Sequence, residues 1–213
     1  MQLLRSTALE PSRFNSTPAV TRTGAILTID LAAIAENYRH LQEQAQTVTC
    51  AAVVKADAYG LGAEAVAPVL AQAGCRQFFV AHLDEGIDLR RILGSGVTIA
   101  VLHGPLAGAE ADFIAHDLVP VLNSLDQVSR WAAAAIAIGT KLPAVLQADT
   151  GMARFGLSES DVRILIDDQR WLGALDVRLL MSHWPAPTNR AIRLMACNSL
   201  CSSRSGEAWG AAG

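Results

Sequence analysis

The feature that most constrains the fold is a regular alternation of short apolar runs with longer segments of helical period, beginning at Ala25. Residues 49–55 (TCAAVVK) are nearly all apolar, as expected of a strand buried on both faces. Repeated β-α units with short loops predict a parallel sheet, either doubly wound or closed as a (β/α)8 barrel of the TIM type. The even spacing and the lack of a Rossmann glycine fingerprint favour the barrel. Further buried strands are predicted at 78–81, 98–102, 119–122, 143–148 and 177–182.

The same pattern predicts the segments around these strands. Residues 25–29 are predicted to form a short opening strand, and Asp30 is a good N-cap for the helix that follows. After the opening strand we therefore expect about six of the eight units of a barrel. Helices are predicted at about 31–46, 63–73, 84–93, 107–115, 125–138 and 158–168.

The two ends of the chain differ from this middle part. Residues 1–24 contain no continuous apolar block and are interpreted as a polar, mobile leader rather than a secretory signal. Residues 184–213 show neither helical nor strand periodicity, and Glu207 is their only acidic residue. We expect residues 25–183 to form the partial barrel and the tail to be a frameshift product, the alternative being a natural divergent C-terminus.

Composition excludes several functional classes. Hydrophobic residues make up 51% of the 213, so the chain can bury a core and is not intrinsically disordered. A net charge of −3 without a basic cluster argues against nucleic acid and anionic membranes as partners. The longest apolar stretch, 131–138, is too short to span a bilayer. The four cysteines form no disulfide framework and no zinc spacing, so we expect a cytoplasmic protein without a metal.

Lys55 is the first candidate for chemistry, because it stands at the carboxyl end of the first buried strand, in VVKADAYGLG. In α/β barrels the carboxyl ends of the strands form the active face. Loss of hydration at the mouth of an apolar site lowers the pKa of a lysine, and the neutral amine can form a Schiff base. The alternative is a lysine that merely extends from a strand end into solvent.

Two later strand ends carry further candidates. Arg154 lies in DTGMARFG, where Gly151 and Gly156 permit a backbone turn that points the guanidinium back over the barrel mouth. Such a group suits a carboxylate or other oxyanion. His183 ends the last predicted strand, in LLMSH. A surface arginine and a structural histidine are the alternatives, but convergence of all three side chains on one mouth predicts a small-molecule site.

These motifs resemble those of a known family. AVVKADAYG resembles the pyridoxal-phosphate attachment motif of alanine racemases, and DTGMARFG and MSH resemble two later motifs of the same family. Similar local matches occur at 29–31, 119–125 and 157–158, so the resemblance extends from about Ala25 to His183. Leu61 is a departure, since the family usually has histidine between the two glycines.

The resemblance implies a role for each matched residue. Lys55 would hold pyridoxal 5'-phosphate and act as one of two catalytic bases, and Tyr59 would reach the cofactor phosphate. Arg154 would contact the phenolic oxygen of the cofactor and the substrate carboxylate, Met152 would line the substrate site, and His183 would lie against the cofactor ring. The implied activity is racemisation of L-alanine to D-alanine for peptidoglycan, by an enzyme that is a homodimer when intact.

The resemblance also implies what is missing. Intact family members add two barrel units and a β-rich domain with the opposite-face tyrosine base, so we expect this chain to be impaired. The alternatives are a non-catalytic cofactor-binding remnant of a damaged gene and a single-barrel pyridoxal-phosphate protein. The latter group does not carry ADAYG after its lysine.

Overall fold

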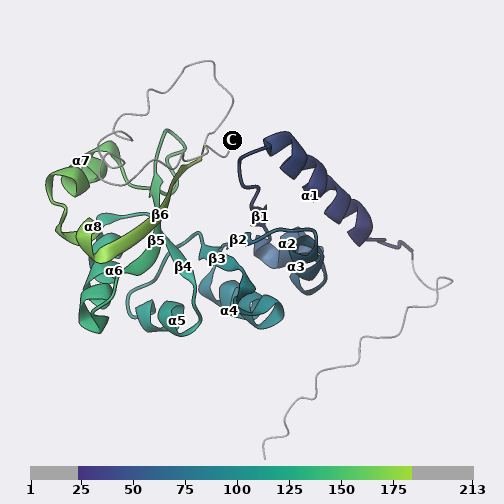
Figure 1. The fold of residues 1–213 in the computed structure, drawn as a ribbon, viewed down its shortest axis with the longest axis horizontal. Helices are drawn as coiled ribbons and strands as arrows, with labels where there is room; N and C mark the ends of the chain where they lie inside the picture. The colour runs from purple at the N-terminus through teal and green to yellow at the C-terminus, as the bar shows by residue number, and fades with distance from the viewer. Residues whose placement is uncertain (1–23, 184–213) are drawn as a thin grey trace, which may run out of the picture. The chain divides into compact units, whose positions relative to one another are not determined.

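Six parallel strands follow one another across one sheet in the order of the sequence, in a computed structural model that describes residues 24–183 (Figure 1). A doubly wound sheet would reverse its strand order at a switch point, whereas sequential order is that of a barrel. The predicted fold class, an α/β barrel of about six units, is therefore confirmed. The strands are β1 (Ala52–Val53), β2 (Gln77–Val80), β3 (Thr98–Val101), β4 (Val119–Leu122), β5 (Leu142–Ala148) and β6 (Leu175–Ser182).

Helices connect the strands, as parallel pairing requires. Both ends of helix α6 are capped. At its N-terminus the Ser124 hydroxyl accepts a hydrogen bond from the Gln127 amide, and at its C-terminus Gly139 adopts a left-handed conformation. The helical segments are α1 (Leu31–Ala45), α2 (Lys55–Gly60), α3 (Ala63–Gln72), α4 (Leu83–Leu93), α5 (Glu110–Ala115), α6 (Leu125–Ile138), α7 (Glu159–Asp167) and α8 (Arg170–Ala174), with a 3-10 turn at Gly94–Gly96.

The two faces of the sheet carry separate hydrophobic clusters. Alternation along β3 sends Ile99 and Val101 into the large cluster shared with the helices, and Ala100 into a smaller one. The smaller cluster also holds Val121 of β4 and Val145 of β5. Small and branched residues gathered on the face opposite the helices are what the interior of a β/α barrel contains.

Some predictions about elements were wrong. Residues 25–29 form no strand, because an apolar run becomes a strand only where a neighbour accepts its backbone hydrogen bonds, and their side chains are largely exposed. The first buried strand is also shorter than expected, at Ala52–Val53. Helix α8 (Arg170–Ala174) was not predicted, and neither was the turn labelled α2.

The chain divides into two units, residues 1–30 and residues 31–213, and the sheet belongs to the second. The predictions of a mobile leader at 1–24 and of a frameshifted tail at 184–213 lie outside the described residues, apart from Gly24. Within residues 24–183, no helix combines the length and the apolar character needed to cross a bilayer.

Candidate functional site at the carboxyl ends of the strands

The predicted strand-end residues lie at one edge of the sheet, because all six strands are parallel. Lys55 follows β1 after a single residue, and Arg154 lies in the loop that follows β5. His183 comes directly after β6, and since Ser182 pairs with Ala148, it is placed beside the start of that loop. The structure therefore brings the three elements that carry Lys55, Arg154 and His183 to the same edge.

Lys55 opens a left-handed turn. The four residues after it, Ala56 to Tyr59, have φ values of 52, 53, 53 and 57°. Left-handed backbone costs about 1–2 kcal/mol for each residue with a Cβ, so a run of four persists only where other contacts hold it. Backbone strain of this kind is concentrated at functional sites.

Contacts from several elements hold this turn. Val54 donates its amide to the Phe79 carbonyl at 2.9 Å, and the Asp57 carboxylate accepts the Ala63 amide at 2.7 Å. Lys55 is half-buried, and its Nζ lies 5.9 Å from the centre of the exposed Tyr59 ring. The lysine thus extends from a backbone held by hydrogen bonds, and its side chain is only partly buried.

Glu85, on α4, reaches this turn from another part of the chain. Its Oε1 accepts the Ala56 amide at 2.6 Å, and its Oε2 accepts the amides of Ala81 and His82 at 2.7 and 3.0 Å. Burial opposes ionisation of this carboxyl, but the three backbone N–H groups outweigh it and hold the pKa of Glu85 below its usual value. The ionised carboxylate ties the turn after β1 to the junction between β2 and α4.

The loop that carries Arg154 is built differently, from its own residues. The Asp149 carboxylate accepts the amides of Gly151 and Ala153 at 2.9 and 3.1 Å, and these bonds lower the pKa of Asp149. Gly156 has φ +119°, and a Cβ there would lie 2.6 Å from the Asp149 amide nitrogen, so only glycine fits. The loop leaves the Arg154 side chain exposed at the mouth.

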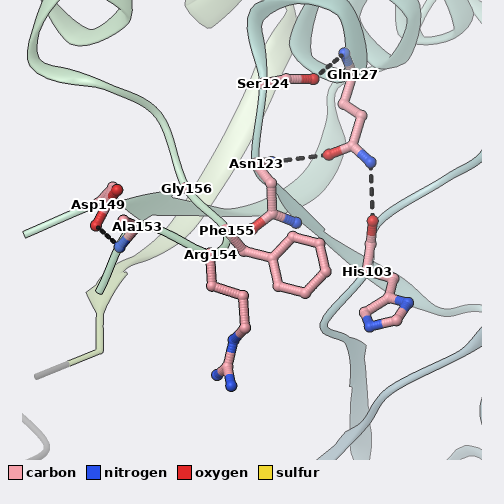
Figure 2. A pocket seen from close by; sticks show the side chains of 9 residues that line it. All are labelled: His103, Asn123, Ser124, Gln127, Asp149, Ala153, Arg154, Phe155 and Gly156. Atoms are coloured by element: carbon pink, nitrogen blue, oxygen red, sulfur yellow. Dashed lines mark hydrogen bonds between the residues drawn. The ribbon is translucent and has the colours of Figure 1, made fainter. Parts of the chain in front are cut away.

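A cavity of about 440 Å³ lies at this edge, between the ends of β3, β4 and β5 (Figure 2). Of the residues predicted for the site, only Arg154 lines it; Lys55, Tyr59, Met152 and His183 do not. Four further lining residues belong to the predicted DTGMARFG segment, whereas His103, Asn123, Ser124 and Gln127 were not predicted, although they come soon after the apolar strands β3 and β4. The lining consists of His103, Asn123, Ser124, Gln127, Asp149, Ala153, Arg154, Phe155 and Gly156.

Gln127 and Asn123, which line this cavity, connect the ends of β3 and β4 through hydrogen bonds. Gln127 accepts the Asn123 amide at 2.8 Å and donates to the His103 carbonyl at 2.8 Å, as Figure 2 shows. Asn123 donates its side-chain amide to the carbonyls of Leu102 and Val121, both at 2.9 Å. Its Oδ1 is buried and accepts no hydrogen bond from the described residues, so it is an acceptor that a ligand or water can use.

His103 lies between the lysine and arginine sides of the mouth. Its ring is 4.1 Å from the His82 ring and 4.9 Å from the Phe155 ring, measured between centroids. Burial lowers the pKa of His103, and the charges of His82, Lys55 and Arg154 lower it further against the opposing effect of Glu85. Both Lys55 and Arg154 are therefore close enough to influence this one imidazole, which favours an anionic ligand at the mouth.

The donor set decides what this mouth can hold. Within residues 24–183, no three His, Cys, Asp or Glu side chains are placed to bind a metal ion. An accessible amine, a guanidinium and an unpaired amide oxygen suit instead an anionic organic molecule with a carbonyl group. The fold and site together define a parallel β/α barrel protein with a positively charged site for an anionic ligand at the carboxyl ends of its strands.

Comparison with known proteins identifies the family. The family described as "Alanine racemase, N-terminal domain" matches residues 29–194, more than three quarters of this chain. The chain belongs to this family.

Individual relatives agree. The alanine racemase of Brucella ovis is 49% identical over 160 residues, which cover 75% of this chain and 40% of the relative. That of Rhodospirillum rubrum is 47% identical over 163 residues, covering 76% and 44%. The chain thus spans about two fifths of the length of these curated relatives.

Solved structures show the same likeness. The alanine racemase from Bartonella henselae, described with covalently bound pyridoxal phosphate, has a TM-score of 0.72 at 39% identity, over 74% of this chain and 46% of that one. The enzyme from Streptomyces coelicolor A3(2) has a TM-score of 0.67 at 32% identity, over 73% and 43%.

Proposed function

We propose that this chain is the lysine-bearing barrel part of a pyridoxal-phosphate-dependent alanine racemase, an isomerase that interconverts L- and D-alanine. The observation that carries the proposal is Lys55, which a held left-handed turn presents at the same edge of the sheet as Arg154 and His183. The alternative of a lysine merely extending from a strand end gives no reason for four strained residues beside it.

The residues present fit this cofactor. The accessible Lys55 amine can bond an aldehyde carbon, and the exposed Tyr59 hydroxyl can donate to a phosphate oxygen. Arg154 can donate to a phenolic oxygen or a substrate carboxylate, and the unpaired Asn123 Oδ1 can accept a further hydrogen bond. When bound, pyridoxal phosphate acidifies the Cα–H of an amino acid by delocalising negative charge into its ring.

The proposed roles follow from these positions. The Lys55 amine would hold the cofactor and then take and return the proton at the alanine Cα from one face. Arg154 would orient the substrate carboxylate, Met152 would line the substrate side, and His183 would lie against the cofactor ring. These assignments rest on motif resemblance and on the strand-end placement of each residue.

Inversion also needs a base on the opposite face of the substrate. The chain has two tyrosines. Tyr38 is buried and donates to the Cys50 carbonyl at 3.1 Å, and Tyr59 belongs to the Lys55 turn. Neither can serve as that base. Loss of an acid–base partner costs roughly 10²–10⁴-fold, so the 213-residue chain by itself should bind the cofactor but racemise alanine very slowly.

For the intact enzyme, we extend the proposal to a cytoplasmic homodimer that supplies D-alanine for peptidoglycan. The mildly acidic charge of the chain supports the absence of nucleic-acid and membrane partners.

Covalent labelling tests the proposal. In the labelling reaction the lysine amine condenses with the aldehyde of pyridoxal phosphate and releases water, and borohydride then adds hydride to the C=N bond. Peptide mapping should find fast labelling at Lys55 and only slow, nonspecific labelling at Lys141, and Lys55→Arg should remove the fast labelling. Lys141→Arg is the matched control, because Lys141 is the only other lysine and its replacement should leave the labelling rate at Lys55 unchanged.

Label on Lys141 alone would overturn the assignment. If Lys55 is labelled but added pyridoxal phosphate gives no racemisation, the chain binds the cofactor without catalysing the reaction.

A further inference from the structure

Glu85 is a carboxylate from a different β-α unit that contacts the backbone immediately after Lys55. Its Oε1 accepts the Ala56 amide at 2.6 Å, across 29 residues of sequence. On the other side of Lys55, the Val54 amide bonds the Phe79 carbonyl at 2.9 Å. The backbone is therefore anchored to the second β-α unit before and after the lysine, at the Val54 amide by β2 and at the Ala56 amide by α4.

This anchoring sets the direction of the lysine side chain. A hydrogen bond at the Ala56 amide fixes the plane of the peptide that joins Lys55 to Ala56, and so fixes the ψ angle of Lys55. Ala56 is also the first left-handed residue of the turn, with φ 52°. Without a partner for its amide, the strained turn can relax toward ordinary backbone and carry the Lys55 Cα–Cβ bond with it.

We propose that Glu85 is a positioning residue that holds the Lys55 amine in the place where it bonds the cofactor, by clamping the Ala56 amide from α4. The inference rests on the proposed function, since it assigns Lys55 the cofactor-bonding role. It adds a residue from a different β-α unit, which the sequence motif around Lys55 does not contain.

The chemistry of the clamp requires a carboxylate. Three N–H groups donate to its two oxygens, one to Oε1 and two to Oε2. The side chain therefore acts only as a hydrogen-bond acceptor. In Glu85→Gln a single oxygen remains for three donors. The amide oxygen takes the Ala81 and His82 amides at the start of α4, and the NH2 group then faces the Ala56 N–H, donor against donor. This isosteric variant therefore keeps the cap of α4 and loses the clamp on the lysine turn.

A second capping carboxylate supplies the matched control. Asp161, near the start of α7, accepts the Ser158 amide at 3.0 Å and the Ser158 hydroxyl at 2.8 Å. It makes the same kind of cap as Glu85 but holds no residue of the lysine turn. Asp161→Asn thus tests what loss of a capping charge alone does to the protein.

The experiment compares the 213-residue chain with Glu85→Gln and Asp161→Asn by two readouts. The first is amide hydrogen exchange at Ala56 by NMR without cofactor, which needs no assumption about function. The second is the initial rate of pyridoxal-phosphate and borohydride labelling at Lys55, divided by that at Lys141 in the same molecules. This ratio cancels differences in protein and reagent concentration, and Asp161→Asn controls for a change in folded fraction.

In Glu85→Gln we expect faster exchange at Ala56 and a Lys55-to-Lys141 labelling ratio lowered about 10- to 100-fold, the size of effect that small misplacements of a reacting group produce. Asp161→Asn should match the wild-type chain in both readouts. Label on wild-type Lys55 with an unchanged ratio in Glu85→Gln would overturn the inference. Absence of label from Lys55 in the wild-type chain would instead overturn the proposed function.

Discussion

The Lys55 turn (residues 55–60) and the Arg154 loop (residues 149–156) both hold left-handed backbone in place, but with carboxylates from different sources. Each follows a strand at the mouth, and each has left-handed backbone whose amides bond a carboxylate. The carboxylate of the Lys55 turn comes from α4, whereas that of the Arg154 loop is Asp149, within the loop itself.

The difference indicates how firmly each side chain is held. A clamp from another element makes the Lys55 backbone depend on the packing of two β-α units, so the lysine is as rigid as the barrel. The Arg154 loop can form from local bonds and two glycines, and it leaves its guanidinium exposed. The first arrangement fits the proposed role of Lys55 as a covalent anchor, and the second fits the proposed role of Arg154 in orienting a carboxylate.

The largest effect should come from Gly156→Ala, which breaks the Arg154 loop alone. An alanine Cβ would meet the Asp149 amide nitrogen at 2.6 Å, in addition to the strain of φ +119°. We expect a loss of about 3 kcal/mol in the free energy of unfolding by urea. Amide exchange at Ala56 in the native state should remain as in the wild-type chain.

Gly151→Ala is the control for that substitution. Gly151 has a similar φ of +118°, but a Cβ there meets nothing within 4 Å. It should therefore cost only the backbone strain, about 1–2 kcal/mol. Equal losses for the two variants would show that close packing against Asp149 does not define the loop.

A smaller effect should follow from removing the carboxylate that each region supplies itself. Asp149→Ala frees the amides of Gly151 and Ala153, and should speed their exchange roughly fivefold without changing Ala56. Asp57→Ala frees the Ala63 amide at the start of α3, and should speed exchange there instead. If either substitution loosened both regions, the independence of the two would be disproved.

The smallest effect concerns pH and the imidazole between the two regions. Burial and nearby cations hold the pKa of His103 below 6.5, so the unfolded chain binds its proton more readily than the folded chain. The contribution of His103 to the free energy of unfolding is therefore fully present above pH 6.5 and is lost as the pH falls below that value. Urea midpoints at about pH 7.5 and about pH 5.5 should therefore differ less in His103→Asn than in the wild-type chain. An equal or larger difference in the variant would contradict this sign.

Periodicity and capping residues predicted most of the barrel. Helix α6 begins and ends as expected, because Ser124 and Gly139 are local signals that need no tertiary context. The apolar run at 25–29 shows where prediction from periodicity fails, since β-structure depends on a partner strand elsewhere in the chain, and none of the six described strands pairs with this run.

The sequence proposed Lys55, Arg154 and His183 for the site because each follows an apolar strand in a recognisable motif, and the structure brings the elements that carry them to the same edge of the sheet. Their roles stay predictions. Glu85 was not predicted, because from the sequence an acidic residue near a helix start is an ordinary cap. His103, Asn123 and Gln127 were not predicted either, because no local sequence pattern indicates their hydrogen-bond partners.

The sequence by itself determined the order of the β-α units, the strand ends at which chemistry can occur and the family to which the chain belongs. These depend on apolar periodicity and on short motifs, which are local properties. Only the tertiary structure decided that Ala56 to Tyr59 adopt left-handed backbone and that Glu85 accepts the amide of the first of them. Only Asp57 among them is of a type that tolerates a positive φ, so local preference does not account for the run of four. The strain is compensated by hydrogen bonds from residues far away in the chain, which exist only once the strands have paired.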